Sequence, residues 1–145
     1  MGNIRICNKE SDIKIMPRFG KKSKERLGSC EKDLQLLFNE VVRYFDCTVT
    51  QGHRKVAEQE KLYKEGKTKV KYGKHNYYPS IAVDVTPYPV DYENTDRHYY
   101  FGGFVLGIAQ DMGIDIRWGG DWDGDRETKD QTFNDLVHFE LRRKK

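Results

Sequence analysis

Two short segments, far apart in the chain, carry the residue types that metal-assisted hydrolysis requires. Residues 74–85 contain His75 and Asp84, and residues 135–140 contain Asp135 and His138. Together they supply two imidazoles and one carboxylate as metal ligands, with a further carboxylate three residues before the second histidine. A catalytic zinc takes three His, Asp or Glu ligands and keeps one position open for water. Because a spare carboxylate can accept the proton of that water, these residue types are the minimum for hydrolysing an amide.

Each of these residues also has a purely structural interpretation. His75 lies in a polar stretch, where a single histidine is usually solvated. Asp84 interrupts the apolar run 81–85, so it is either a hydrogen-bonded structural carboxylate or a charge that points into a cleft while its neighbours fill the core. His138 has the same two interpretations, because a core histidine bonded to a backbone carbonyl fits its apolar neighbours. Glu140, two residues further along the same strand face, is placed to orient an imidazole or to bind substrate.

The two segments follow the pattern His-Asn-x-x-Pro-Ser-x-Ala-Val-Asp-Val and, much later, Asp-Leu-x-His-Phe-Glu. This pattern resembles that of the zinc L-alanyl-D-glutamate peptidases of bacteriophages. These endolysins are related to D-alanyl-D-alanine carboxypeptidases and, in fold, to the hedgehog signalling domain. The resemblance covers residues 34–141 and includes Gln-Gly-His-Arg at 51–54 and Arg-Trp-Gly-Gly-Asp-Trp at 117–122. The spacing of nine residues from His75 to Asp84 is longer than in many relatives and looks like that of a phage subgroup.

The resemblance implies a role for each residue of the pattern. The implied zinc ligands are His75, Asp84 and His138, and the implied catalytic acid/base is Asp135. In a regular strand Asp135 and His138 would face opposite ways, so this role requires a turn or bulge near Leu136.

Arg54 closes the Gln-Gly-His-Arg motif and has two interpretations. The family pattern supports an arginine here that stabilises the tetrahedral intermediate or grips a substrate carboxylate in a bidentate fork. The alternative is a surface arginine on a turn. We expect its neighbour His53 to be structural or substrate-lining, and His98 to be a surface residue.

The implied function is that of a zinc metallopeptidase, which hydrolyses the L-alanyl-D-glutamate bond of peptidoglycan stem peptides and lyses bacteria at the end of a phage cycle. One alternative is a D-alanyl-D-alanine carboxypeptidase of the same fold. A second is a non-catalytic zinc-bearing module that binds the cell wall. A third, a basic nucleic-acid binder, lacks any recognisable motif, so we expect peptidoglycan and no nucleic acid as partner.

Length and composition are consistent with this function. The 145 residues predict a single zinc peptidase domain spanning 1–145, monomeric, with a less regular basic segment at 1–28. No apolar run is long enough for a membrane span, and the N-terminus lacks the features of a signal peptide. We therefore expect synthesis in the host cytoplasm and action on the cell wall after release. The cysteines, which are Cys7, Cys30 and Cys47, form no CxxC motif and predict free thiols.

Charge is distributed unevenly along the chain. The formal net charge is only +3. Residues 13–26 carry six basic side chains against one acid, which predicts either a solvated face or a surface that attracts an anionic polymer. An acidic stretch contains Asp121, Asp123 and Asp125, an oxygen-rich arrangement that suits Ca²⁺. It lacks the offsets of an EF-hand, so an acidic solvated loop is the alternative.

The elements that position these residues predict an α+β fold, with a small, mainly antiparallel sheet packed against about three helices. Weak alternation before residue 16 indicates one or two short strands. Helices are predicted from an N-cap at Ser29, over 56–64, and from a cap at Thr95 to about Met112. Strands are predicted at 47–50, 80–86, 114–118 and 137–141. Glycines at 102, 103 and 107 allow the third helix to pack closely against the sheet.

Overall fold

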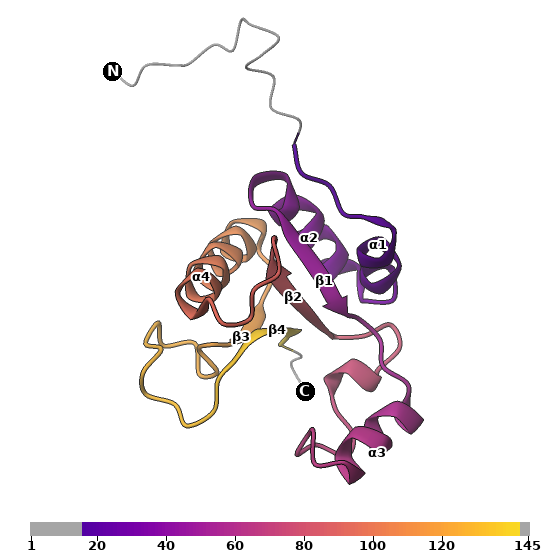
Figure 1. Cartoon of the computed structure of the whole chain (residues 1–145). Coiled ribbons are helices and arrows are strands. Elements are labelled where there is room, and N and C mark those ends of the chain that lie inside the picture. The colour runs from indigo at the N-terminus through magenta and orange to yellow at the C-terminus, as the bar shows by residue number, and fades with distance from the viewer. Residues whose placement is uncertain (1–15, 143–145) are drawn as a thin grey trace, which may run out of the picture.

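The computed structural model describes residues 16–142. Its elements are α1 (Lys21–Gly28), α2 (Lys32–Tyr44), β1 (Cys47–Gln51), α3 (Val56–Lys64), the 3₁₀ turn η2 (Lys74–Asn76), β2 (Ala82–Pro87), α4 (Thr95–Met112), β3 (Ile116–Gly119) and β4 (Asp135–Leu141). The strands pair antiparallel in the order β1-β2-β4-β3 (Figure 1). This confirms the predicted α+β class, with α1 as a helix that the sequence did not predict.

The pleat of β2 and β4 separates a core face from a polar face. Val83 pairs with Phe139, and both are fully buried. The ring of Phe139 lies 5.3 Å from Phe38 of α2 and 6.1 Å from Phe101 of α4, measured between centroids. Helices α2 and α4 cover this face. Because successive side chains of a strand point to opposite faces, the next residues along β2 and β4 point away from the helices.

Helix α4 packs closely against β3 at one glycine. A Cβ added at Gly102 would lie 2.2 Å from the ring of Trp118, whereas one added at Gly103 or Gly107 would meet no atom within 4 Å. The predicted close approach is therefore confirmed for Gly102 and wrong for the other two. Trp118 is itself 3% exposed, so its ring has little room to move away.

Several predicted boundaries differ from those observed. Ser29 does not cap α2; it follows α1 as its C-cap, and α2 begins after Glu31. The cap of α4 is Asn94 rather than Thr95, because the Asn94 side chain accepts a hydrogen bond from the Arg97 backbone N–H. The short strands predicted before residue 16 lie outside the described residues.

Two predictions about single side chains had opposite outcomes. His98 is buried rather than on the surface, because its ring bonds to the Thr86 hydroxyl at 2.8 Å and to the Asn94 carbonyl at 2.8 Å. Cys30 and Cys47 are buried free thiols, as predicted, and burial raises the pKa of Cys30 to about 12. Cys7 lies outside the described residues. Within residues 16–142, no helix has the length and apolarity of a membrane span.

Candidate metal centre

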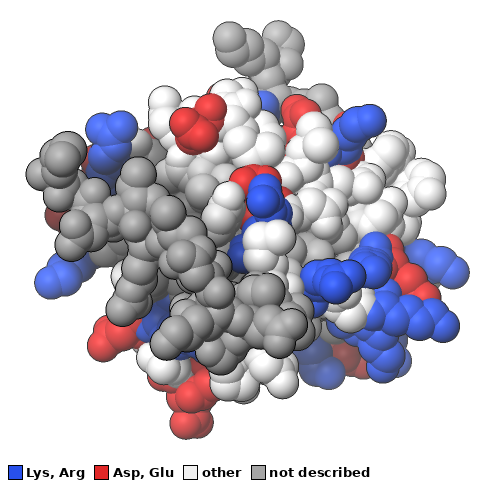
Figure 2. Space-filling view, turned by 90° about the horizontal axis from the view of Figure 1, so that it is seen from above, with Lys and Arg blue, Asp and Glu red and all other residues white. Residues whose placement is uncertain are grey.

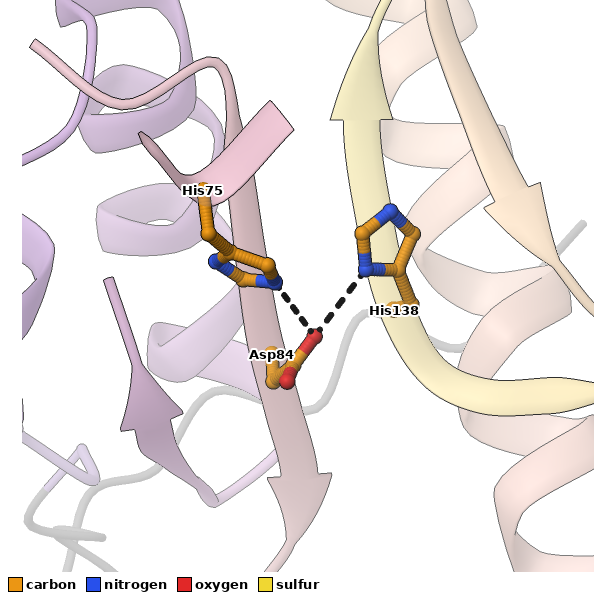
Figure 3. Close-up of side chains that lie close together, drawn as sticks. All are labelled: His75, Asp84 and His138. Carbon is orange, nitrogen blue, oxygen red and sulfur yellow. Dashed lines mark hydrogen bonds and ion pairs between the residues drawn. The ribbon is translucent and has the colours of Figure 1, made fainter. Parts of the chain in front are cut away.

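The structure brings His75, Asp84 and His138 together from three separate elements. His75 lies in η2, Asp84 in the middle of β2 and His138 directly opposite Asp84 on β4 (Figure 3). Asp84 Oδ1 is 3.2 Å from His75 Nε2 and 3.2 Å from His138 Nδ1. One ligand atom from each residue lies within 4.8 Å of the other two, which is the spacing of groups that share one ion.

The orientation of both imidazoles is fixed by bonds on their far sides. His75 Nδ1 is 2.8 Å from the carbonyl oxygen of Gly52, so that nitrogen donates its proton. His138 Nε2 is 2.9 Å from Glu140 Oε1 and donates likewise. As neutral rings, both therefore present a lone pair to the Asp84 oxygen. Two ring nitrogens and one carboxylate oxygen therefore face one point. Additional protons or a cation would stabilise this arrangement.

A chain of contacts behind His138 supports its orientation. Glu140 is 5% exposed, and its second oxygen accepts a 3.0 Å bond from Arg117. The Arg117 guanidinium lies over the Trp122 ring, 5.3 Å from the centroid, and Trp122 in turn lies 5.7 Å from the His138 ring. This matches the orienting role that the sequence offered for Glu140. Neither the Arg117 contact nor the Trp122 contact was predicted.

Charge at the centre is set by competition between burial and hydrogen bonding. Burial opposes ionisation of Asp84, but bonds from His138 and His75 outweigh it and lower the pKa of this carboxyl. Burial also disfavours the cationic form of His138, yet its bonds to Asp84 and Glu140 raise its pKa to about 9. The centre thus favours a positive charge between the carboxylates of Asp84 and Glu140.

Asp135 lies at the start of β4, where the pairing with β3 is irregular. Trp118 pairs with Phe139, but the next residue, Gly119, pairs with Asp135, so the register shifts between them. This is the irregularity near Leu136 that the catalytic role requires. A Cβ at Gly119 would lie 2.0 Å from the Asp135 carbonyl oxygen, so glycine is needed for this approach. Burial, then the charge of Asp84, raises the pKa of Asp135.

Arg54 is attached to the centre through its backbone. Its N–H donates to the His75 carbonyl at 2.8 Å, and its own carbonyl accepts from the side chain of Asn76 at 2.9 Å. Its guanidinium is bound by two amide oxygens, those of Gln59 and Gln51. The sequence motifs included Gln51 and Asn76 but suggested no role for them, and Gln59 lies outside the motifs.

The acidic loop forms a second cluster. The carboxylates of Asp121, Asp123 and Asp125 lie within 4.8 Å of one another. The buried Asp121 already accepts backbone N–H groups from Gly124 and Arg126. Exposed acidic groups are common without an ion, and nothing else in the cluster supports the predicted calcium.

Comparisons with known proteins relate the chain as a whole to peptidases. The sequence profile of a family described as phage L-alanyl-D-glutamate peptidase matches residues 15–142. The chain is 24% identical over 120 residues to the L-alanyl-D-glutamate peptidase of Escherichia phage T5, covering 79% of this chain and 88% of that protein. It is 29% identical over 113 residues to the peptidoglycan L-alanyl-D-glutamate endopeptidase CwlK of Bacillus subtilis (strain 168), covering 66% and 60% respectively. A crystal structure of the Serratia marcescens L-Ala D-Glu endopeptidase ChiX superposes with a TM-score of 0.67 at 25% identity, covering 84% of this chain and 87% of that one.

Proposed function

The chain belongs to the phage L-alanyl-D-glutamate peptidase family, and from this premise we propose that it cuts peptidoglycan stem peptides at a zinc centre formed by His75, Asp84 and His138. The observation that carries the proposal is the convergence of these ligand atoms within 4.8 Å of one another.

The donor set fits zinc. Two imidazole nitrogens and one carboxylate oxygen are the ligand types of catalytic zinc sites. Both rings are oriented from behind, His75 by Gly52 and His138 by Glu140, and such partners fix the tautomer that leaves a lone pair for the metal. When bound, zinc polarises the scissile carbonyl and makes water more acidic.

Asp135 is the residue to which we assign proton transfer. Its carboxylate accepts a proton from the attacking water and passes it to the nitrogen of the leaving D-glutamate residue. Water thereby adds to the L-alanyl carbonyl carbon, the C–N bond breaks, and the products are a carboxylate and an amine. Partial burial supports this role, because it raises the pKa of the carboxyl and so favours proton uptake.

Arg54 is the residue to which we assign recognition of negative charge. A guanidinium grips a carboxylate or an oxyanion through paired N–H groups. Glutamate has two carboxyl groups and a continuing peptide uses one, so the other can lie beside the scissile bond. The support for this role is that Arg54 has no carboxylate partner among residues 16–142, although it lies on the loop that contacts His75.

The biological setting follows from the same family. We infer that the protein is made in the host cytoplasm, acts on the wall after release and lyses the cell. We also infer that it acts as a monomer, since one chain supplies all three ligands and Asp135.

The test is product identification. Purified peptidoglycan is digested, and the fragments are analysed by mass spectrometry. Cleavage at the proposed bond leaves L-alanine on the glycan and releases peptides that begin with D-glutamate. Release of D-alanine alone would instead identify a carboxypeptidase, and intact stem peptides would leave only the wall-binding alternative.

A further inference from the structure

We propose that Gln59 is a positioning residue that holds the Arg54 guanidinium where it meets substrate. This inference rests on the role given to Arg54 above. Gln59 lies in α3, outside the motifs that suggested the metal centre.

The Gln59 amide is fixed at both ends. The side chain is 3% exposed, and its Oε1 accepts a 2.9 Å bond from Arg54 Nη1. Its Nε2 donates to the backbone carbonyl of Val70. Turning the amide over would place an NH₂ group against the guanidinium and an oxygen against a carbonyl. Both contacts would be repulsive, so only one orientation satisfies the buried amide.

Gln59 is an uncharged partner for the Arg54 guanidinium. A carboxylate at the same place would bind a guanidinium more strongly, and α3 carries carboxylates on either side, at Glu58 and Glu60. The buried position between them holds an amide instead. The second partner, Gln51, is also an amide, at 3.4 Å. Arg54 is therefore held in place while its charge remains available to an anion.

One of the three guanidinium nitrogens of Arg54 has no partner within residues 16–142. Its Nε–H is buried and has no hydrogen-bond partner among the described residues. A buried donor without a partner keeps the full cost of its desolvation, which a structural arginine rarely bears without compensation. Because Nε itself is buried, an anion would meet the remaining Nη N–H groups, and its charge would offset this cost.

Gln51 connects this arrangement to the metal centre. It pairs across the sheet with Asp84, so its backbone neighbours that of a proposed ligand. Through Gln51 and Gln59, the guanidinium is tied both to β1, beside the centre, and to α3. The loop around Val70 is tied to the same amide.

A double-mutant cycle tests this role. We compare kcat/KM of wild type, Gln59→Met, Arg54→Ala and the double variant on purified peptidoglycan. Gln59→Met is expected to lower kcat/KM by roughly 10- to 100-fold, the range for losing a hydrogen bond to a charged group. It should change the same parameter, KM or kcat, that Arg54→Ala changes. In the Arg54→Ala background, it should cause no further loss.

Two more variants separate positioning from mere packing. Gln59→Glu keeps the shape and the acceptor for Arg54 but pairs a carboxylate with the guanidinium, and it also loses the donor to the Val70 carbonyl. If the free charge matters, activity falls while the protein remains folded. Gln35→Met is the matched control, because the Gln35 side chain donates to the Cys30 carbonyl at 2.8 Å and does not contact Arg54. Melting temperature and zinc content are measured for every variant, and Gln59→Asn replaces Gln59→Met if the latter does not fold.

Each failure has a distinct signature. Equal losses from Gln59→Met in both backgrounds, or full activity of Gln59→Glu, would overturn the positioning role and leave the role of Arg54 intact. An unchanged kcat/KM in Arg54→Ala would remove Arg54 from the mechanism and this proposal with it. Neither result bears on the proposed function, which the product analysis tests separately.

Discussion

At the scale of single residues, the centre is a set of acceptors arranged around one point. His75 and His138 both donate protons away from Asp84, and the Asp84 oxygen faces both rings. Residue type made these residues candidate ligands, and the family resemblance assigned them that role. Neither could identify Gln59, since a buried glutamine in a polar helix looks like any exposed one. The same limit explains why His98 was wrongly predicted to be a surface residue. Its partners Thr86 and Asn94 form no recognisable sequence motif with it.

The first residue-scale prediction concerns Asp135. Asp135→Asn keeps the shape of the side chain but removes its ability to accept a proton, so kcat should fall by about 10²- to 10⁴-fold. Zinc content should not change, because Asp135 is not among the proposed ligands. Asp111→Asn, at an exposed position of α4, is the control and should behave as wild type. An undiminished kcat in Asp135→Asn would exclude it as the acid/base.

The second residue-scale prediction concerns pH and the chelated protein. The pKa of His138 is raised from 6.5 to about 9 by bonds to Asp84 and Glu140, which outweigh burial. A raised pKa means that the protonated ring stabilises the fold. This contribution is fully present below about pH 6.5 and is lost as pH rises through about 9. The free energy of unfolding in chelator should therefore fall by roughly 1–3 kcal/mol between these limits.

His138→Gln provides the control for this pH effect. The variant has no titrating ring at this position, so denaturant unfolding in chelator should give a flatter profile from pH 6 to 9. Identical slopes for the variant and the wild type would assign the effect to another group.

At the scale of elements, the sheet register creates the centre. Pairing of Asp84 with His138 places both on one face, while pairing of Val83 with Phe139 directs the core to the other. The register then shifts at Gly119, which pairs with Asp135 at the start of β4. Strand alternation predicted the two faces, but pairing partners are not encoded in local sequence. Helix α1 was missed for a related reason: only Ser23 and Leu27 are buried in it, so no apolar stripe marks it.

The element-scale prediction concerns the packing of α4 on β3. Gly102→Ala places a methyl group where the Trp118 ring lies, 2.2 Å from the added carbon, and should destabilise the fold by about 1–3 kcal/mol. Gly103→Ala, on the open side of the same helix, should be neutral or stabilising by up to about 1 kcal/mol. Thermal melts of the pair check this. Equal stability of the two variants would show that α4 does not approach Trp118 as described.

At the scale of the whole molecule, charge is distributed unevenly. Figure 2 shows Lys and Arg side chains gathered toward one side of the face in view, the side on which α1 and α3 lie in Figure 1. Exposed basic residues of α1 and the segment before it include Arg18, Lys21, Lys22 and Lys24. The sequence offered a solvated face or an attraction to an anionic polymer, and the structure is compatible with both.

A salt dependence distinguishes these two interpretations of the basic side. If it attracts the wall polymer, sedimentation of Asp135→Asn with purified cell walls should weaken as NaCl rises from 50 to 500 mM, because counterions screen exposed charges. In the same Asp135→Asn background, replacing Lys21, Lys22 and Lys24 together with Gln should weaken wall binding at low salt. Equal wall binding with and without these three replacements, at all salt concentrations, would support a solvated face.

A zinc titration of activity decides whether the three ligands form a catalytic metal centre. Protein stripped with chelator and dialysed should not cleave peptidoglycan, and cleavage should return in proportion to added zinc until one equivalent per chain is bound. Asp84→Asn should not recover at the same zinc concentrations. Full cleavage by the metal-free chain, or full recovery in Asp84→Asn, would contradict a zinc centre built by His75, Asp84 and His138.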